Sequence, residues 1–522
     1  MSGCTLLLIV LLVSAFFSLL HYLWVGSIWV IAGVSSPLLP NISRFEVHSL
    51  PKGPALPRNW AGRLEIPEVE EGNSLFFWLF EAEEAEYDEN LIRLTTGGGP
   101  VIFEGNTTNL VRNPYSWSKL GHVLYIDQPA GTGFSTASNP YPVTTQDRVS
   151  SDFYKWMQGF FSHFPHLSSK RVHMMGESYA GIYIPYFASE ILKNHESLPI
   201  NIASLSLGDG TWGDSVAMSS AATGAYLRLH RSLLNISEDT VSAFTEADQM
   251  CRFDTVMQQA SEYPPTGTIL VPGNGDEMNI KLRFSRDTES AESATCNTHP
   301  KTADEILASI LNSTCDERCA TFSTAINYLS TANKCFDVYN IRHGCDTANP
   351  MALLEDYFNR ADVQIALNIH PQSRDAQKPL FQQCNHDILT TLLSAPTPPT
   401  APAYDILPRL ITTENISVHI YSGEYDMLVN HLGTELCLQN MSWRGAQGFT
   451  EKPYRVFYTD QALPETPKLT NGEKEKTSRR EAGIFASERG LTYHLFWGAG
   501  HTVISDKPQE MFAYVRDVVL GS

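Results

Sequence analysis

The sequence predicts an α/β fold in which a mostly parallel central sheet carries an inserted helical cap. Two observations predict it. Short apolar, strand-like runs alternate along the chain with segments of helical length. One long polar segment, residues 214–338, has no strong strand run and holds five of the nine cysteines. The chain of 522 residues is long enough to bury a large core.

Residues 44–213 are expected to form the first part of the sheet and its helices. Aromatic side chains recur at helical spacing between residues 147 and 164, which predicts a core-facing helix. The elements expected in this part are strands over 75–80, 122–127 and 171–175, a helix over 147–164, and a helix from the turn after 175 to about 192.

The cap is expected over residues 214–338, stapled by disulfides, and the sheet is expected to resume within residues 339–522. Apolar runs at 418–422 and 491–497 predict two further strands. The core is therefore interrupted once by the cap.

The charge balance excludes one class of partner. The chain has 37 Lys and Arg against 57 Asp and Glu, a formal net charge of −20. Because such a field repels a polyanion, we expect no nucleic-acid partner.

The N-terminal segment predicts entry into the secretory pathway. No Asp, Glu, Lys or Arg occurs from Met1 to Ser43, and most of this stretch is apolar. We interpret residues 1–36 as a signal peptide or a signal anchor, since the apolar run is long enough to span a bilayer. The protein is expected to contact a membrane only if this segment stays uncleaved.

Sequons and cysteines favour the same compartment. Eight cysteines follow the leader. Cys315 and Cys319 are spaced like metal ligands, but no His or second Cys pair accompanies them at ligand spacing, so structural disulfides are favoured. Asn-x-Ser/Thr sequons predict glycosylation at Asn41, Asn106, Asn235, Asn312, Asn415 and Asn440. The sequence thus predicts a lumenal, vacuolar or secreted glycoprotein.

A nucleophile elbow is the sharpest local motif. The predicted strand 171–175 runs into Gly176-Glu177-Ser178-Tyr179-Ala180-Gly181, and a predicted helix follows. Small residues on either side of a serine let strand and helix pack closely while the hydroxyl projects. Ser178 is therefore the candidate nucleophile.

A serine nucleophile needs a base and an orienting acid, and both follow in the expected order. Asp426 comes directly after the strand 418–422, and His501 comes after the strand 491–497. Glu424 is a rival acid two residues before Asp426. The order Ser, acid, His, each after its own strand, predicts a catalytic triad of Ser178, Asp426 and His501.

These motifs together resemble the serine carboxypeptidase family, and the likeness extends from about residue 44 to the end of the chain. The segments that carry it are Asn113-Pro114-Tyr115-Ser116-Trp117, Tyr125-Ile126-Asp127-Gln128-Pro129-Ala130-Gly131-Thr132-Gly133-Phe134-Ser135, Gly176–Gly181, Tyr421-Ser422-Gly423-Glu424-Tyr425-Asp426 and Gly498-Ala499-Gly500-His501. A further tract, Asn430-His431-Leu432-Gly433-Thr434-Glu435, resembles fungal members that process peptides in the secretory pathway.

The resemblance implies an α/β-hydrolase fold and removal of C-terminal residues from peptides or proteins, best at acidic pH. It implies that the backbone N–H of Tyr179 is an oxyanion donor and that Glu177 helps to bind the terminal carboxylate of the substrate. Two carboxyl groups share a hydrogen bond only when one is protonated, which would explain the acid preference. No metal and no organic cofactor is implied.

One stretch departs from the family pattern. The family has Trp-x-Asn-Gly-Gly-Pro-Gly-Cys-Ser-Ser and a short helix where this chain runs from Thr96 directly into Gly97. The resemblance implies that this segment supplies the second oxyanion donor, further carboxylate ligands and a cysteine partner for Cys384. Ile504 also stands where the family has Pro.

The missing segment leaves three readings open. The chain is an active carboxypeptidase whose sequence was interrupted in the gene model, or an esterase or acyltransferase of the same fold, or a non-catalytic secreted glycoprotein. The intact triad motifs favour the first reading, although the missing segment predicts impaired activity for the chain as written.

Overall fold

The computed structural model describes residues 42–69, 71–94, 97–138, 145–272, 302–310, 319–345, 350–369, 381–382, 384–393, 401–460 and 479–521. The predicted leader, residues 1–36, lies outside the described residues. Phe45–Ser522 is one compact unit, separate from Met1–Arg44.

Strands alternate with helices through the described chain. The strands are β1 (Asn59–Glu65), β2 (Ser74–Phe80), β3 (Asn90–Leu94), β4 (Val101–Phe103), β5 (Leu110–Arg112), β6 (His122–Asp127), β7 (Arg171–Glu177), β8 (Asn201–Gly208), β9 (Ser417–Gly423), β10 (Ser442–Trp443), β11 (Ala446–Gln447), β12 (Arg455–Asp460), β13 (Arg479–Glu488) and β14 (Leu491–Phe496).

The α-helices are α2 (Gln146–His163), α3 (Ala180–Lys193), α4 (Ser215–Met218), α5 (Ser220–Leu229), α6 (Arg231–Leu234), α7 (Glu238–Cys251), α8 (Phe253–Ala260), α9 (Ala303–Ile310), α10 (Thr321–Ala332), α11 (Pro350–Phe358), α12 (Ala361–Ala366), α13 (His386–Leu393), α14 (Ile406–Thr412), α15 (His431–Asn440), α16 (Val503–Asp506) and α17 (Pro508–Tyr514). Short 3₁₀ or π turns are η1 (Ile42–Phe45), η2 (Ala85–Tyr87), η3 (Trp117–Lys119), η4 (Pro165–Leu167), η6 (Pro402–Tyr404) and η7 (Val515–Val519).

One large sheet organises the unit. Its strand order is β1-β2-β6-β3-β7-β8-β9-β14-β13-β12. The central strands, from β6 to β14 in this order, pair in parallel, whereas the two outer pairs on each side are antiparallel. This is the mostly parallel sheet of the α/β-hydrolase fold that the sequence predicts. The strands predicted at 75–80, 122–127, 171–175, 418–422 and 491–497 are confirmed as β2, β6, β7, β9 and β14.

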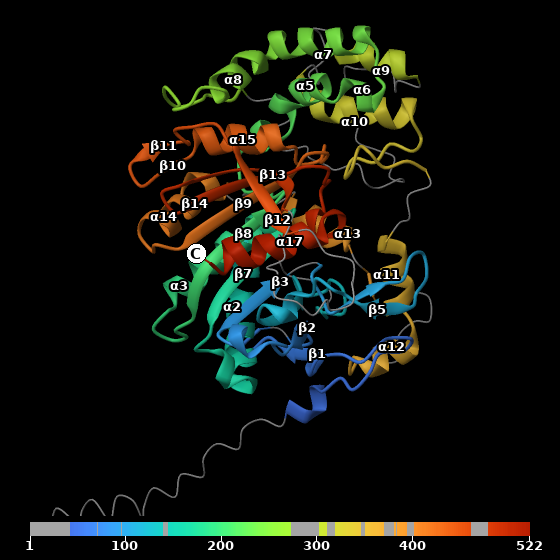
Figure 1. Cartoon of the computed structure of the whole chain (residues 1–522), viewed down its shortest axis with the longest axis vertical. Helices are drawn as coiled ribbons and strands as arrows, with labels where there is room; N and C mark the ends of the chain where they lie inside the picture. The colour runs from blue at the N-terminus through green and yellow to red at the C-terminus, as the bar shows by residue number, and fades with distance from the viewer. Residues whose placement is uncertain are drawn as a thin grey trace, which may run out of the picture. The chain divides into compact units, whose positions relative to one another are not determined.

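Both faces of the sheet are covered by apolar layers, as strand β2 shows. Its residues are all buried and point alternately to the two faces. Phe77 packs against Trp156 and Phe160 of α2. Phe76 and its face-mates belong to a buried cluster on the opposite face that also holds Tyr514 of α17. Figure 1 shows α2 and α17 at the sheet.

The described part of residues 214–338 contains helices α4–α10 and no strand. These helices have a hydrophobic cluster of their own around Tyr226 and Phe244, which extends to Met427. In Figure 1, α5, α7, α9 and α10 lie together beyond α15. The predicted helical character of this segment is confirmed, while its boundaries at 213/214 and 338/339 stay predictions.

In the part of this region that the structure describes, two disulfides are formed. Cys251 at the end of α7 pairs with Cys319, and Cys335 pairs with Cys345. Cys384 and Cys437 are free thiols, the first exposed and the second buried. Cys296 and Cys315 lie outside the described residues.

Candidate active site

Ser178 occupies a sharp turn between β7 and α3. Its φ of +60° lies in the left-handed region, which few residues with a side chain adopt. Its backbone is held by neighbours, because Ser178 N–H donates to Gly208 O (3.0 Å) and Ser178 O accepts from Thr211 N–H (3.2 Å). A strained serine at a strand-to-helix turn is the nucleophile elbow predicted from the sequence.

The packing at Gly181, three residues after the serine, requires a residue without a side chain. A Cβ at this position would lie 2.6 Å from Thr211 N and 2.9 Å from Gly210 Cα. The first turn of α3 can therefore approach the loop after β8 only because position 181 has no side chain. Ala180, at the position where the motif usually has glycine, is itself buried.

Asp426 lies in the loop after β9 and is fully buried. Its Oδ1 accepts from Leu428 N–H (2.8 Å) and Val429 N–H (3.2 Å). Its Oδ2 lies 2.8 Å from Nδ1 of His501. The carboxylate is thus fixed by the backbone on one side and faces the imidazole on the other.

His501 follows β14 and is likewise buried, with 6% of its surface exposed. The backbone N–H of His501 donates to Tyr339 O (2.7 Å). The ring centroids of Tyr339 and His501 lie 5.3 Å apart. Burial by itself lowers the pKa of His501, but the charge of Asp426 and the hydrogen bond to it outweigh burial and raise this pKa above its ordinary value.

The rival acid has a different partner. Glu424 Oε2 accepts from Gly498 N–H (2.8 Å), in the turn that leads to His501. Glu424 therefore ties the loop after β9 to the loop after β14, and Asp426 is the acid in contact with the imidazole.

Glu177 and Tyr179 flank the serine. Glu177 ends β7, and the Tyr421 hydroxyl donates to its Oε1 (3.4 Å). Tyr179 directly precedes α3, so its N–H belongs to the first helical turn, where amide groups have no partner within the helix. Such an amide can stabilise negative charge on a reacting oxygen.

Asp209 is a residue of this site that the sequence analysis missed. It follows β8 directly, and its side chain is fully buried. The available signal was the sequence Gly208-Asp209-Gly210, an acid between two glycines at the carboxyl end of a parallel strand. Its contacts are described below.

The end of β3, where the family pattern breaks, lies near the segment after His501. Residues 95 and 96 lie outside the described residues, and Gly97 resumes with φ +69°. A Cβ on Gly97 would lie 2.5 Å from Ile504 Cγ2. The next carbonyls are anchored, because Trp117 N–H donates to Gly98 O (2.9 Å) and Asn113 Nδ2 donates to Gly99 O (2.8 Å).

The predicted glycosylation sites fall into three groups. Asn106, Asn235 and Asn415 are exposed. The side-chain amide of Asn440 is engaged, since it accepts from Ile269 N–H (2.8 Å) and donates to Ile269 O (2.9 Å). Asn41 and Asn312 lie outside the described residues.

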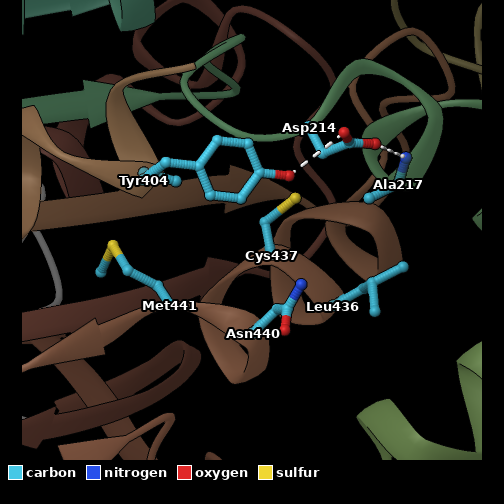
Figure 2. A pocket seen from close by; sticks show the side chains of 8 residues that line it. Asp214, Ala217, Tyr404, Leu436, Cys437, Asn440 and Met441 are labelled. Carbon is cyan, nitrogen blue, oxygen red and sulfur yellow. Dashed lines mark hydrogen bonds between the residues drawn. The ribbon is translucent and has the colours of Figure 1, made fainter. Parts of the chain in front are cut away.

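Figure 2 shows a pocket that Asn440 borders together with Asp214 and Tyr404. The Tyr404 hydroxyl donates to Asp214 (3.2 Å), whose carboxylate also caps α4. Of the predicted site residues, Asn440 alone lines this pocket. Among the described residues, no group of three His, Cys, Asp or Glu side chains is arranged to hold a metal ion. No helix within the described ranges is both long and apolar enough to cross a membrane.

Comparison with known proteins decides the family. The serine carboxypeptidase family model matches residues 52–521. The chain is a member of the serine carboxypeptidase family. A carboxypeptidase Y homolog of Arthroderma benhamiae is 45% identical over 500 residues, covering 92% of this chain and 94% of the relative.

More distant relatives agree. A pheromone-processing carboxypeptidase of Aspergillus oryzae is 27% identical over 511 residues, covering 93% of this chain and 70% of the relative. The crystal structure of a prohormone-processing carboxypeptidase from Saccharomyces cerevisiae matches with a TM-score of 0.62 at 20% identity, covering 92% of this chain and 97% of that structure. The structural likeness supports the α/β-hydrolase fold. As a serine-type carboxypeptidase, this hydrolase has peptide or protein substrates.

Proposed function

We propose that this serine carboxypeptidase releases C-terminal amino acids through an acyl-enzyme intermediate, with Ser178 as nucleophile, His501 as general base and Asp426 as the orienting acid. The observation that carries the proposal is the 2.8 Å contact between His501 Nδ1 and buried Asp426 Oδ2, in a chain whose strained elbow places Ser178 at the same edge of the sheet.

The steps follow from this arrangement. Asp426 holds Nδ1, so the other ring nitrogen, Nε2, takes the proton of Ser178 Oγ as Oγ attacks the scissile carbonyl. The N–H of Tyr179 donates to the oxyanion of the tetrahedral intermediate. His501 then protonates the nitrogen of the leaving amino acid, and the C–N bond breaks. His501 then deprotonates the water that attacks the remaining ester, and it returns this proton to Ser178 Oγ as the ester C–O bond breaks.

Binding of the substrate's C-terminal carboxylate is a second requirement of the proposed reaction. A carboxypeptidase must also bind the free carboxylate of its substrate, and Glu177 beside the nucleophile is the candidate group in this chain. A protonated Glu177 donates to a carboxylate, whereas an ionised one repels it, so binding should improve as the pH falls. Because this chain lacks the family segment, its selectivity for substrates with a free C-terminus should be weaker than that of family members that have the segment.

The proposed reaction is tested by release of the C-terminal amino acid from an N-blocked dipeptide at about pH 4–6, with the chain as written and with Ser178→Ala. We expect release by the first protein and none by the second. Release that persists in Ser178→Ala, or no release by either protein while both are folded, would contradict the proposal.

We propose that the protein acts in the secretory pathway or in a vacuole-like compartment. The disulfides Cys251–Cys319 and Cys335–Cys345 fit an oxidising lumen. Asn106, Asn235 and Asn415 are the exposed acceptors for carbohydrate. Asn440 is half-buried, and carbohydrate would have to attach to the same Nδ2 that donates to Ile269 O. Endoglycosidase treatment followed by mass spectrometry should therefore find occupancy at the three exposed asparagines and little at Asn440.

A further inference from the structure

Asp209 is a fully buried carboxyl group that the proposed mechanism leaves without a role. It stands directly after β8, with φ +40°, and its N–H donates to Tyr421 O (2.9 Å). The position is the carboxyl end of a central parallel strand, one strand away from the loop that carries Asp426. A buried acid at this place needs a partner for each oxygen.

The contacts of Asp209 lead to Asp426. Both of its oxygens accept from Gly423 N–H, at 2.9 and 3.2 Å. A side-chain hydrogen bond also links the two carboxyl groups of Asp209 and Asp426. Both side chains are fully buried, and a hydrogen bond between carboxyl groups requires one proton.

The proton belongs on Asp209. Asp426 already accepts from Leu428 N–H and Val429 N–H through Oδ1 and faces the imidazole of His501 through Oδ2, so both of its oxygens act as acceptors. Burial, the negative charge of Asp426 and that of Glu177 raise the pKa of Asp209 well above its ordinary range, while the Gly423 N–H bond opposes them.

Three of the other titratable groups near this pair are tyrosines, which are neutral over the pH range of interest. The pKa values of Tyr226, Tyr421 and Tyr493 are raised, in each case chiefly by burial and further by the charge of neighbouring acids, Asp209 among them. The remaining titratable groups near the pair are Glu177 and, beyond Asp426, His501.

We propose that Asp209 is a positioning residue whose protonated carboxyl group donates a hydrogen bond to Asp426 and holds it against His501. This inference rests on the proposed function of the Ser178–His501–Asp426 triad.

The proton on Asp209 has two consequences for catalysis. It draws charge from the carboxylate that faces His501, so His501 loses its proton at a lower pH than beside an unshared aspartate. When Asp209 ionises at higher pH, two buried carboxylates repel each other and Asp426 moves from its position. Activity therefore has an acid limb set by His501 and an alkaline limb set by Asp209.

Two variants distinguish the effect of a hydrogen-bond donor at position 209 from the effect of ionising its carboxyl group. Asp209→Asn keeps a donor that never ionises, whereas Asp209→Ala removes the donor. In kcat/KM against pH, Asp209→Asn should keep the acid limb of the parent enzyme and lose the alkaline limb. Asp209→Ala should lower kcat more than it changes KM and should move the acid limb upward by about one pH unit.

A matched control uses Asp127, a partly buried acid whose pKa is raised by burial to about 7. It accepts from Phe134 N–H (2.7 Å) at the end of β6. Asp127→Asn likewise removes an acid whose pKa burial raises, and it should leave the limbs where they are in the parent enzyme.

A spectroscopic measurement keeps the inference testable without turnover. The Nδ1 proton of His501 can be followed by NMR against pH in Ser178→Ala, alone and combined with each Asp209 variant. The pKa of His501 should be about one unit higher with Asp209→Ala and nearly unchanged with Asp209→Asn.

The outcomes are distinct. An inactive parent enzyme would contradict the proposed function, and the NMR titration would still decide the role of Asp209. Coincident His501 titrations in all three proteins, or Asp209→Asn behaving as Asp209→Ala, would overturn the inference.

Discussion

Two regions at the same edge of the sheet differ in how far they keep the family pattern. The loops after β7, β9 and β14 carry Ser178, Asp426 and His501, and their backbones are joined by hydrogen bonds such as Tyr425 N–H to Ala499 O (2.7 Å). The chain after β3 lacks the family segment and returns at Gly97 against Ile504. The comparison predicts that bond cleavage and recognition of the substrate C-terminus depend on separate structural parts.

The base gives the largest expected effect. Replacing His501 with Ala removes the group that takes the proton of Ser178, so kcat/KM on a blocked dipeptide should fall by about 10⁴–10⁶. His343 is a matched control, because its Nδ1 also lies 2.9 Å from an aspartate, Asp337. A similar loss in His343→Ala would show that general damage, and not loss of the base, lowers the rate.

The two acids after β9 give the next effect. Asp426→Asn leaves the wrong hydrogen-bonding partner for His501 Nδ1, and kcat should drop by about 10⁴. Glu424→Gln should keep most activity, since an amide oxygen still accepts from Gly498 N–H. If Glu424→Gln were the more damaging change in steady-state kinetics, our assignment of the orienting acid would be wrong.

The end of β3 can be repaired to sharpen the comparison. Inserting the family segment between Thr96 and Gly97 should raise kcat by about 10²–10³, the usual contribution of one oxyanion donor. It should also raise the preference for a free C-terminus over an amidated one. A glycine-serine insert of equal length is the control, and an equal gain with it would refute a specific role for the segment.

The smallest expected effect concerns stability at acidic pH. Burial lowers the pKa of His173 and His494 to about 3 and that of His419 to about 4. Each stays neutral in the folded chain but binds a proton below pH 6.5 when unfolded. The contribution of these neutral histidines to the free energy of unfolding is therefore fully present above about pH 6.5. Below that pH, each histidine lowers the free energy of unfolding by about 1.4 kcal/mol per pH unit.

His494→Phe tests this pH dependence. The ring of His494 stacks on Phe485 and has an imidazole nitrogen buried without a hydrogen bond. The free energy of unfolding is measured with denaturant at pH 5 and at pH 7 for the parent and the variant. The difference between the two pH values should be about 2 kcal/mol smaller in the variant than in the parent. An unchanged difference would assign the acid sensitivity to other groups.

Much of the fold and of the site could be predicted from local sequence. Apolar runs bounded by turns located β6 and β9, and the elbow motif located Ser178, because these features depend on neighbouring residues. The acidic run at residues 81–89, taken by itself, favours a hairpin tip after β2, but the strand order contradicts that interpretation. Strand β2 pairs with β1 and β6, so the stretch connects β2 to a strand that is not its neighbour.

The parts that could not be predicted depend on contacts between distant segments. The sequence favoured Asp426 but left Glu424 as a rival acid, and only their partners, His501 and Gly498, distinguish the two. Asp209 has no motif of its own, and its role comes from Gly423 and Asp426, more than 200 residues away. Strand order and side-chain contacts across the sheet determine which residues of distant segments meet, and local sequence does not show them.

Labelling with a fluorophosphonate tests the central claim most directly, because the reagent needs an activated serine but no binding of a C-terminal carboxylate. We predict that mass spectrometry finds one adduct on Ser178 of the chain as written, and that His501→Ala abolishes it. A folded chain with no adduct on Ser178, or with labelling that persists in His501→Ala, would contradict the claim that the cleavage machinery is intact despite the missing segment.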